Sequence, residues 1–214
     1  MGGRDVKSGQ ELGGVPSRVR DPERAEKIVS AAAELFAERG YHTVSLADIG
    51  QASGIVGSGI YRHFESKHAV LLAIVENPMI DLLERSDRIV DEHTDSVTTL
   101  RQLIKTQIDF CLDSRNVVLL YRQESHFLQD EHARRIRRLQ RRYVENWIAT
   151  QLELRPELDD ATARTLVHSC IGAIQSVLTF DSGLSRTDLE LTLVSMAERL
   201  LAADHTPRAH RNGS

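Results

Sequence analysis

Two short helical patterns joined by a glycine turn, between Ser45 and Phe64, constrain the fold of this chain more than any other feature. The first pattern begins at Ser45-Leu-Ala-Asp48, where the Ser45 hydroxyl and the Asp48 carboxylate can each accept the other's backbone N–H. It ends near Gly54, and a second short helix is predicted over residues 57–64. Two short helices with so tight a turn predict a helix-turn-helix, whose second helix can enter the major groove of DNA.

Apolar residues recur at helical spacing through the rest of the chain, and no segment alternates as a strand does. The first helix is predicted to open at Asp21 and Pro22 and to end at Gly40, which tolerates a left-handed backbone. Ser66 is expected to cap a longer helix, which Pro78 should kink or break because proline has no amide hydrogen. Further helices are predicted over 79–92, 96–113, 116–128, 131–153, 159–181 and 186–203. The sequence therefore predicts an all-α fold of roughly nine helices.

Composition excludes several classes of protein. Of the 214 residues, 41% are hydrophobic and 27% are charged, as in a globular domain. No run approaches the roughly 18 apolar residues of a membrane span, and the N-terminus lacks the apolar run of a signal peptide, so we expect a cytoplasmic protein without a membrane partner. Cys111 and Cys170 lie in apolar helical patterns without metal-ligand spacing, so we expect reduced core cysteines, no metal and no cofactor.

Charge by itself does not mark a nucleic-acid-binding segment. The formal net charge is -4, and residues 1–75 contain nine Lys and Arg against nine Asp and Glu. Residues 1–20 have the composition of a flexible arm, as do residues 204–214. Arg18 and Arg20 of the first arm are positioned either to enter a minor groove or grip phosphate, or to remain solvated.

Residues 22–75 resemble the TetR family of bacterial transcriptional regulators. The resemblance rests on a helix ending ELFAERGY, followed by SLADI, ASGI and IYRHFESK. It implies a helix-turn-helix DNA-binding domain over 21–75, a ligand-binding and dimerisation domain over 76–203, and a dimeric repressor of double-stranded operator DNA. A small-molecule effector that favours one arrangement of the dimer would then shift its recognition helices away from the operator spacing.

The same resemblance makes residues 57–64 the recognition helix, with Ile60 and Phe64 facing the core. Val56 and Gly57 depart from the usual family pattern, so we expect weak direct base reading, with sequence selected partly through DNA shape where small residues let the backbone approach. Phosphate contacts should dominate, because hydroxyl and cationic side chains bind phosphate readily. The alternatives are that Tyr61 packs, His63 caps and Arg62 is solvated. The residues expected at DNA are Arg18, Arg20, Ser45, Gly57, Ser58, Tyr61, Arg62, His63 and Lys67.

Six arginines lie in the stretch ARRIRRLQRRYVENW, between Ala133 and Trp147, opposite an apolar stripe. This basic face is either solvated and paired with glutamates, or binds a phosphate-bearing ligand, or makes an extra DNA contact. The solvated face is the first interpretation. Between the two binding roles we favour a ligand over DNA, because late helices in TetR-like chains lie away from the operator and some relatives sense acyl-coenzyme A thioesters. Met79, Cys111 and Phe180 are further candidates for an apolar pocket. The residues expected at the effector are Phe110, Tyr121, Phe127, Arg138, Arg142, Tyr143 and Trp147, with Arg138, Arg142 and Trp147 at the mouth.

The last two predicted helices are expected to form a four-helix dimer interface, as the family resemblance implies. Two other functions remain open at this stage. One is a DNA-binding regulator without ligand response. The other is an enzyme that holds a phosphorylated substrate on the arginines with His126 or His168 as base, although no nucleophile or acid-base pair supports it and we expect no enzyme. The residues expected in the interface are Leu166, Cys170, Ile174, Val177, Leu193 and Met196.

Overall fold

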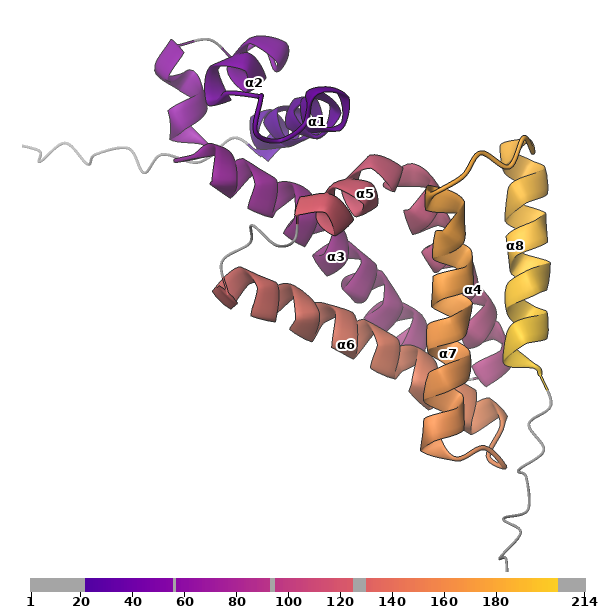
Figure 1. The fold of residues 1–214 in the computed structure, drawn as a ribbon. Helices are drawn as coiled ribbons and strands as arrows, with labels where there is room; N and C mark the ends of the chain where they lie inside the picture. The colour runs from indigo at the N-terminus through magenta and orange to yellow at the C-terminus, as the bar shows by residue number, and fades with distance from the viewer. Residues whose placement is uncertain (1–21, 56, 93–94, 125–129, 204–214) are drawn as a thin grey trace, which may run out of the picture.

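The computed structural model describes residues 22–55, 57–92, 95–124 and 130–203, and Figure 1 shows their arrangement. Within these ranges the chain forms eight α-helices, two short 3-10 helices and no strand. The all-α fold predicted from helical periodicity is therefore confirmed. No helix among the described residues is long and apolar enough to cross a membrane.

The N-terminal unit, residues 22–75, begins with α1 (Pro22–Arg39), α2 (Leu46–Ala52) and the 3-10 helix η1 (Gly57–Arg62). Pro22 is the first residue of α1, where its missing N–H leaves no hydrogen bond unmade. Beyond the last turn, Gly40 has φ +81° and donates its N–H to the Phe36 carbonyl at 2.9 Å. The predicted start and end of this helix are confirmed, whereas the capping residue Asp21 lies outside the described residues.

The next helix, α3 (Lys67–Glu92), runs from the N-terminal unit into the rest of the molecule (Figure 1). Pro78 lies inside it, although proline has no N–H to donate to the carbonyl four residues earlier. The helix continues because its apolar face is buried on both sides of the proline. Val75 is buried before it, and Met79 and Leu82 are buried after it. Of the kink or break predicted near Pro78, the break with a separate helix over 79–92 is wrong, and the kink stays a prediction.

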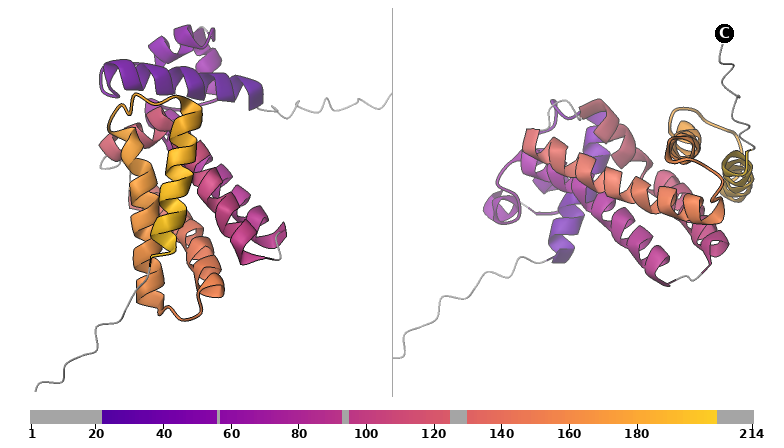
Figure 2. Two further views of the ribbon diagram at one scale, coloured as in Figure 1. Left: turned by 90° about the vertical axis from the view of Figure 1, so that its right-hand side faces the viewer. Right: turned by 90° about the horizontal axis from the view of Figure 1, so that it is seen from below.

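The remaining helices form the body of the molecule, residues 76–203, together with the second half of α3. Their bounds lie close to the predicted ranges, except that α7 passes into the 3-10 helix η3 (Ser176–Leu178) before residue 181. The left panel of Figure 2 shows α7 and α8 side by side and antiparallel, with no other helix covering them on that side. The helices of the body are α4 (Ser96–Asp113), α5 (Arg115–Glu124), α6 (Asp130–Leu154), α7 (Asp160–Gln175) and α8 (Arg186–Leu201).

Two hydrophobic clusters meet on α3. Val75 belongs to the cluster of the N-terminal unit and Met79 to the cluster of the body, so one core replaces the other within about one helical turn. The domain boundary expected at 75–76 thus lies inside a continuous helix. Leu120 of α5 and Ile136 of α6 belong to the N-terminal cluster, and α5 packs against α1. The N-terminal unit is therefore seated on the body by apolar contacts as well as by α3.

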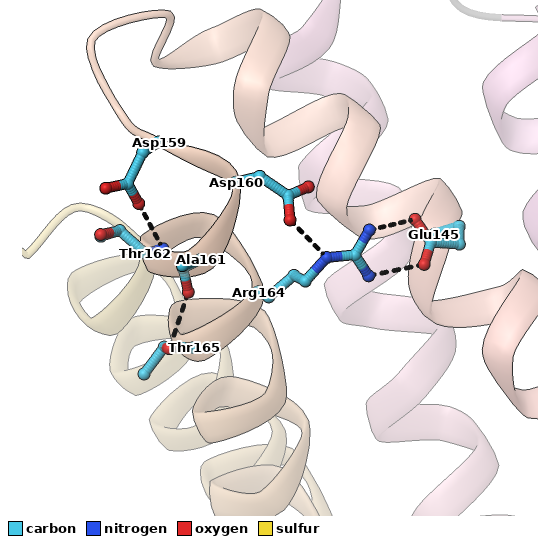
Figure 3. A network of polar contacts seen from close by, with 7 residues as sticks. All are labelled: Glu145, Asp159, Asp160, Ala161, Thr162, Arg164 and Thr165. Carbon is cyan, nitrogen blue, oxygen red and sulfur yellow. Dashed lines mark hydrogen bonds and ion pairs between the residues drawn. The ribbon is translucent and has the colours of Figure 1, made fainter.

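Polar contacts of Arg164 hold the start of α7 against α6 (Figure 3). Its two terminal nitrogens donate to the carboxylate of Glu145 at 2.6 and 3.0 Å, and its Nε donates to Asp160 at 2.7 Å. These contacts raise the pKa of Arg164 further and hold the pKa of Glu145 below its usual value. At the first turn of α7, the Asp159 carboxylate accepts the Thr162 N–H at 2.7 Å and caps the helix.

Candidate DNA-binding and effector sites

A reciprocal cap starts α2. The Ser45 hydroxyl accepts the Asp48 N–H at 3.1 Å, and the Asp48 carboxylate accepts the Ser45 N–H at 2.8 Å and its hydroxyl at 2.6 Å. The hydrogen bonds from Ser45 also lower the pKa of Asp48. The predicted capping box is confirmed, and it gives the Ser45 hydroxyl a partner inside the N-terminal unit.

The turn after α2 is closed by short-range backbone contacts that require glycine. Gly54 has φ +71°, and the Ile55 N–H donates to the Gly50 carbonyl at 2.8 Å. A Cβ on Gly50 would lie 2.7 Å from the Ile55 carbonyl oxygen, and a Cβ on Gly59 would lie 2.9 Å from the Ile55 side chain. Gly59 is therefore explained by packing within the turn, which is a different reason from the approach to DNA that its sequence context suggested.

The recognition element is tighter and shorter than the helix predicted over 57–64. It is the 3-10 helix η1, and the N–H groups of His63 and Phe64 both donate to the Ile60 carbonyl at 3.0 Å. Small residues at its start favour this, because glycine lowers α-helical stability. Ile60 is buried and Phe64 packs against the same core, as predicted.

Tyr61 and Arg62 are the side chains of η1 that the structure leaves exposed to solvent, with 64% of Tyr61 accessible. His63 differs from its predicted position. Its ring is half-buried with Nδ1 unpaired, and it lines a groove between α1 and α3 together with Phe64. Among the residues expected at DNA, Arg18 and Arg20 and the side chains at 57–58 lie outside the described part of the chain.

Lys67 has a role that the sequence did not reveal. Its Nζ donates to the carbonyls of Tyr41 at 2.7 Å and Val44 at 2.8 Å, with the His42 carbonyl at 3.4 Å, and it lies 4.3 Å from the centre of the Tyr41 ring. These contacts use the three donors of an ammonium group, so no N–H is left for the phosphate expected here. Lys67 instead fastens the loop between α1 and α2 to the first turn of α3. The partners lie 23 to 26 residues away, and no local pattern signals such a contact.

A cavity of about 330 Å³, here called the effector cavity, lies between α3, α4, α5, α6 and α7. Of the described residues around it, none is Asp, Glu, Lys or Arg. Its polar lining consists of Gln107, Gln140, His168 and Gln175 together with the Tyr143 hydroxyl, and sequence reasoning missed the first four. Its apolar walls are formed by Val75, Met79, Leu82, Phe110, Val117, Val118, Tyr121, Ile136, Val144 and Ile171.

One polar chain crosses the wall of the cavity. The Tyr143 hydroxyl donates to Gln107 Oε1 at 2.8 Å, and Gln107 Nε2 donates to the Cys111 sulfur at 3.2 Å. Burial raises the pKa of Tyr143, and it raises the pKa of Cys111 to about 11 and that of Cys170 to about 12. The hydroxyl and both thiols therefore stay protonated near neutral pH, and the cysteines are buried and free as expected. A buried glutamine on an otherwise apolar face was the available signal for Gln107.

Three of the residues predicted at the effector line the cavity, namely Phe110, Tyr121 and Tyr143. The predicted mouth residues do not. Trp147 is completely buried in the core of the body, and Arg142 points to α3, where it donates to Asp87 at 2.8 Å.

Other expected lining residues also lie elsewhere. Arg138 is exposed outside the cavity, Cys111 is buried beside it, and Phe180 is half-exposed beyond α7. Helical register explains the error, because the residues of α6 that face the cavity are Ile136, Gln140, Tyr143 and Val144. Phe127 and His126 lie outside the described residues.

The predicted dimer interface is wrong at four of its six positions. Cys170, Ile174, Val177 and Leu193 are buried inside the protomer, because α7 packs between α6 and α8 and uses its apolar stripe for the core. Leu166 and Met196 are half-buried against the same core. The apolar pattern of a helix predicts that one face is buried. It does not predict whether the element packed on that face belongs to the same chain or to a second protomer.

No group of three His, Cys, Asp or Glu residues within the described ranges is arranged to hold a metal ion. His168, weighed as a catalytic base, is a mainly exposed residue of the cavity wall. The candidate sites are therefore the exposed side chains of Tyr61 and Arg62 on η1, the effector cavity in the body, and the outward side of α7 and α8.

This combination defines a helix-turn-helix unit joined to a helical body that contains a cavity, and comparison with known families assigns it. The profile of bacterial regulatory proteins of the tetR family matches residues 28–74, and the tetracyclin repressor-like C-terminal domain matches residues 93–179. The chain belongs to the TetR family, whose members are transcriptional regulators rather than enzymes.

The chain is 31% identical over 126 residues to the transcriptional repressor KstR2 of Rhodococcus jostii RHA1, covering 58% of this chain and 62% of that protein. The ketosteroid regulator KstR2 of Mycobacterium tuberculosis has the same fold, with a TM-score of 0.70 at 20% identity over 86% of this chain and 95% of that one. The regulator AibR, solved with isovaleryl coenzyme A and operator DNA, matches with a TM-score of 0.66 at 21% identity over 81% of this chain and 97% of that one.

Proposed function

We propose that this protein is a dimeric repressor that binds operator DNA through η1 and is released by a hydrophobic small molecule in the effector cavity. The observation that carries the effector part is the wall of the cavity. Val75 and Ile136 line the cavity and also belong to the hydrophobic cluster of the N-terminal unit. A ligand that displaces either residue therefore acts on the core that positions η1, and it shifts the equilibrium between two arrangements of that unit.

The chemistry of the cavity selects the class of ligand. Its lining is mainly apolar, and its glutamines, histidine and tyrosine donate or accept single hydrogen bonds without offering a full charge. A free carboxylate buried there would lose its hydration without gaining a cationic partner. We therefore expect the buried part of the effector to be uncharged, such as a hydrocarbon chain or ring system carrying one or two oxygen atoms. The ketosteroid named for one fold neighbour, and the isovaleryl group of the coenzyme A ester named for another, belong to this chemical range.

Binding to DNA is expected to depend on the backbone phosphates. Tyr61 and Arg62 are exposed on η1 and supply a hydroxyl and a guanidinium, which suit phosphate oxygens and the edges of bases. Two copies of η1 in a symmetric dimer would meet half-sites about one helical turn of DNA apart. Family membership and the structure of AibR in complex with operator DNA support this proposal.

The outward faces of α7 and α8 are the proposed dimer interface, in place of the buried residues above. Leu191 of α8 is 65% exposed, and Leu184, just before the start of α8, is 48% exposed. Exposed large apolar side chains on a monomer favour a surface that another chain covers. On α7, the exposed positions carry small residues such as Ser169 and Gly172, which let a second helix approach closely. Leu191→Glu should convert the dimer to a monomer in sedimentation analysis and weaken operator binding. An unchanged dimer would contradict this interface.

The decisive experiment combines DNA selection with ligand release. Genomic fragments retained by the full-length protein at moderate salt should share a two-fold symmetric sequence, and recovery of no specific fragment would refute the DNA-binding part. The neutral fluorescent probe N-phenylnaphthylamine should bind the wild-type cavity and reduce operator affinity. Val118→Trp, which fills the cavity from α5, should lose the probe and keep operator binding. If the probe binds the cavity but the protein stays on DNA, the effector part is refuted and a regulator without ligand response remains.

A further inference from the structure

The arginines of α6 divide into two groups. Arg142 donates to Asp87 of α3, and Arg135 lies 3.7 Å from Glu76, which also belongs to α3. The other four are exposed and form no ion pair with any residue in the described ranges. These four, here called the arginine stripe, are Arg134, Arg137, Arg138 and Arg141.

The middle of the arginine stripe has no acidic residue beside it on α6. The members of the stripe are spaced at i, i+3, i+4 and i+7, so they share one side of the helix over about 10 Å. The residues three or four positions from Arg137 and Arg138 are alanine, glutamine or arginine. Glu131 and Glu145 lie beyond the two ends, and Arg164 engages both carboxylate oxygens of Glu145 (Figure 3). Like charges at these spacings destabilise a helix, so an anion bound along the stripe would relieve their repulsion.

The exposed arginines of α3 show the more usual arrangement. Arg85 follows Asp81 by four residues and Arg88 follows Glu84 by four residues, with all four side chains exposed. Opposite charges at this spacing offset each other on a helix surface. The arginine stripe differs from this surface of α3 because it carries one sign of charge, in a chain whose formal net charge is -4.

The arginine stripe and η1 lie on different sides of the molecule. The inner face of α6 is buried through Ile136 and Tyr143, so the exposed stripe is on its outer face. Figure 1 shows the N-terminal unit at the top and α6 below it, and the right panel of Figure 2 shows α6 across the front of the molecule when seen from below. A straight duplex held at η1 would therefore not pass the stripe of the same protomer.

We propose that the arginine stripe is a second DNA-binding surface, which holds a duplex segment other than the one at η1. Guanidinium groups donate paired hydrogen bonds to phosphate oxygens, and contacts with phosphates supply essentially all of non-specific DNA binding. A dimer on its operator would present two stripes and join a second DNA segment to the first. The proposal rests on the proposed function only for the first duplex, which η1 binds.

The chemistry of the stripe favours DNA over other anionic partners. An acidic protein is usually held around a buried aromatic or aliphatic anchor, and a helix on an anionic membrane inserts apolar side chains. Between Arg134 and Arg141, a stretch that the structure describes throughout, α6 exposes no large apolar side chain. A phosphate backbone requires only the charges that the stripe has.

The test measures whether operator-bound protein captures a second duplex. An operator fragment from the genomic selection is immobilised and saturated with full-length protein, and a labelled duplex of unrelated sequence is added at low salt. The variant is Arg137→Gln with Arg138→Gln, and Arg137→Lys with Arg138→Lys keeps the charge. The matched control, Arg85→Gln with Arg88→Gln, removes the same charge from exposed positions of α3. Thermal unfolding at fixed protein concentration checks that each variant is folded.

We expect the glutamine variant to capture the second duplex about tenfold or more weakly than the wild type, with unchanged operator affinity. Two phosphate contacts are lost, so the slope of log affinity against log salt should become shallower by about 2. The lysine variant and the α3 control should stay close to the wild type, since both retain the charge of the stripe.

Four outcomes would overturn the inference. The first two are equal capture by the glutamine variant and the wild type, and an equal loss in the α3 control. The third is a parallel loss of operator affinity in the glutamine variant, which would assign the stripe to the operator itself. The fourth is stripe-dependent binding to phosphatidylglycerol vesicles or to polyglutamate that is tighter than binding to the duplex.

The variant Tyr61→Ala with Arg62→Ala separates this inference from the proposed function, because it removes the exposed side chains of η1. Its binding to the labelled duplex is measured by fluorescence anisotropy, with and without the glutamine substitutions in the stripe. If stripe-dependent binding persists while the genomic selection recovers no fragment, η1 is refuted as the DNA-binding element and the stripe is retained. If the selection succeeds and capture of the second duplex fails, only the stripe is refuted.

Discussion

The N-terminal unit and the body are each stabilised by polar contacts, and the two sets differ in how far apart the bonded residues lie in the sequence. In the N-terminal unit the cap of α2 joins Ser45 to Asp48, and the next turn joins Ile55 to Gly50, over three and five residues. In the body, the hydrogen bond in the cavity wall joins Tyr143 to Gln107, which are 36 residues apart. Local backbone contacts determine the conformation of the helix-turn-helix formed by α2 and η1. The cavity is instead formed by side chains that can be substituted without altering a turn. The difference suits the proposed function, in which one region binds DNA and the other binds a ligand.

The largest effect is expected from the core of the body. Trp147→Ala removes a side chain with no exposed surface, and its cavity should cost about 3–5 kcal/mol of unfolding free energy. Thermal unfolding at fixed protein concentration measures this, with Arg85→Gln as a surface control. A loss as small as that of the control would mean that the body tolerates a void and would weaken the contrast between the two regions.

Lys67→Met tests a long-range polar contact within the N-terminal unit. It leaves the carbonyls of Tyr41 and Val44 without their cationic donor, and we expect a loss of about 1.5–3 kcal/mol, as for hydrogen bonds to charged groups. Chemical denaturation measures the change. If stability is kept while operator affinity falls and its salt dependence flattens, Lys67 binds phosphate as its sequence position suggested.

Gly50→Ala should break the local turn. The added Cβ would lie 2.7 Å from the Ile55 carbonyl oxygen, and the backbone shift should cost about 1–3 kcal/mol and reduce operator binding. Gln102→Ala is the control, because Gln102 is exposed on α4, away from the turn, the cavity and the proposed interface. That change should leave stability and operator binding nearly unchanged. Binding of N-phenylnaphthylamine should persist in the Gly50 variant, and its loss would show that the turn and the cavity are not separable.

A serine N-cap in each region allows a direct comparison. Ser45 caps α2 and Ser185 caps α8, where its hydroxyl accepts the Asp188 N–H at 3.2 Å. Replacing either serine by alanine should cost about 1 kcal/mol. Operator affinity should fall for Ser45→Ala and remain unchanged for Ser185→Ala. Equal effects on DNA binding would mean that the N-terminal unit responds to general stability rather than to its own cap.

The smallest effect is expected at the ion pair between α6 and α7. Arg164 lowers the pKa of Glu145, so the pair contributes stability above the ordinary pKa of glutamate and loses it as the pH falls through the lowered value. Both side chains are largely exposed, so solvent screens the interaction. The melting temperature of Arg164→Gln should lie slightly below that of the wild type at neutral pH and converge with it as the pH falls through the lowered pKa of Glu145. A constant difference across this range would exclude the linkage.

Features that depend on neighbouring residues were predicted well. Pro22 and Gly40 delimit α1, and the cap at Ser45 forms as its spacing indicated, because each depends on the backbone within one or two turns. The continuation of α3 through Pro78 was missed, since burial on both sides of a proline outweighs one absent hydrogen bond and is not visible locally.

Partner choice could not be predicted from the same patterns. Lys67 was expected at phosphate and contacts carbonyls of a distant loop, and Arg142 was expected at a ligand and pairs with Asp87. Cys170 was expected between protomers and lies in the protomer core. In each case the residue type was interpreted correctly as cationic or apolar, and the identity of its partner required the packing of helices.

The sequence by itself determined that this chain is all-helical, where most helices begin and end, and that residues 45–64 form a helix-turn-helix of a TetR-type regulator, because caps, glycines and periodicity act over a few residues. Only the tertiary structure decided that α7 covers α6, that glutamines line the cavity, and which arginines of α6 are left without a partner. Those outcomes depend on how helices far apart in the chain are rotated and cross. An apolar stripe specifies which face of a helix is buried, and it does not specify which helix packs against that face.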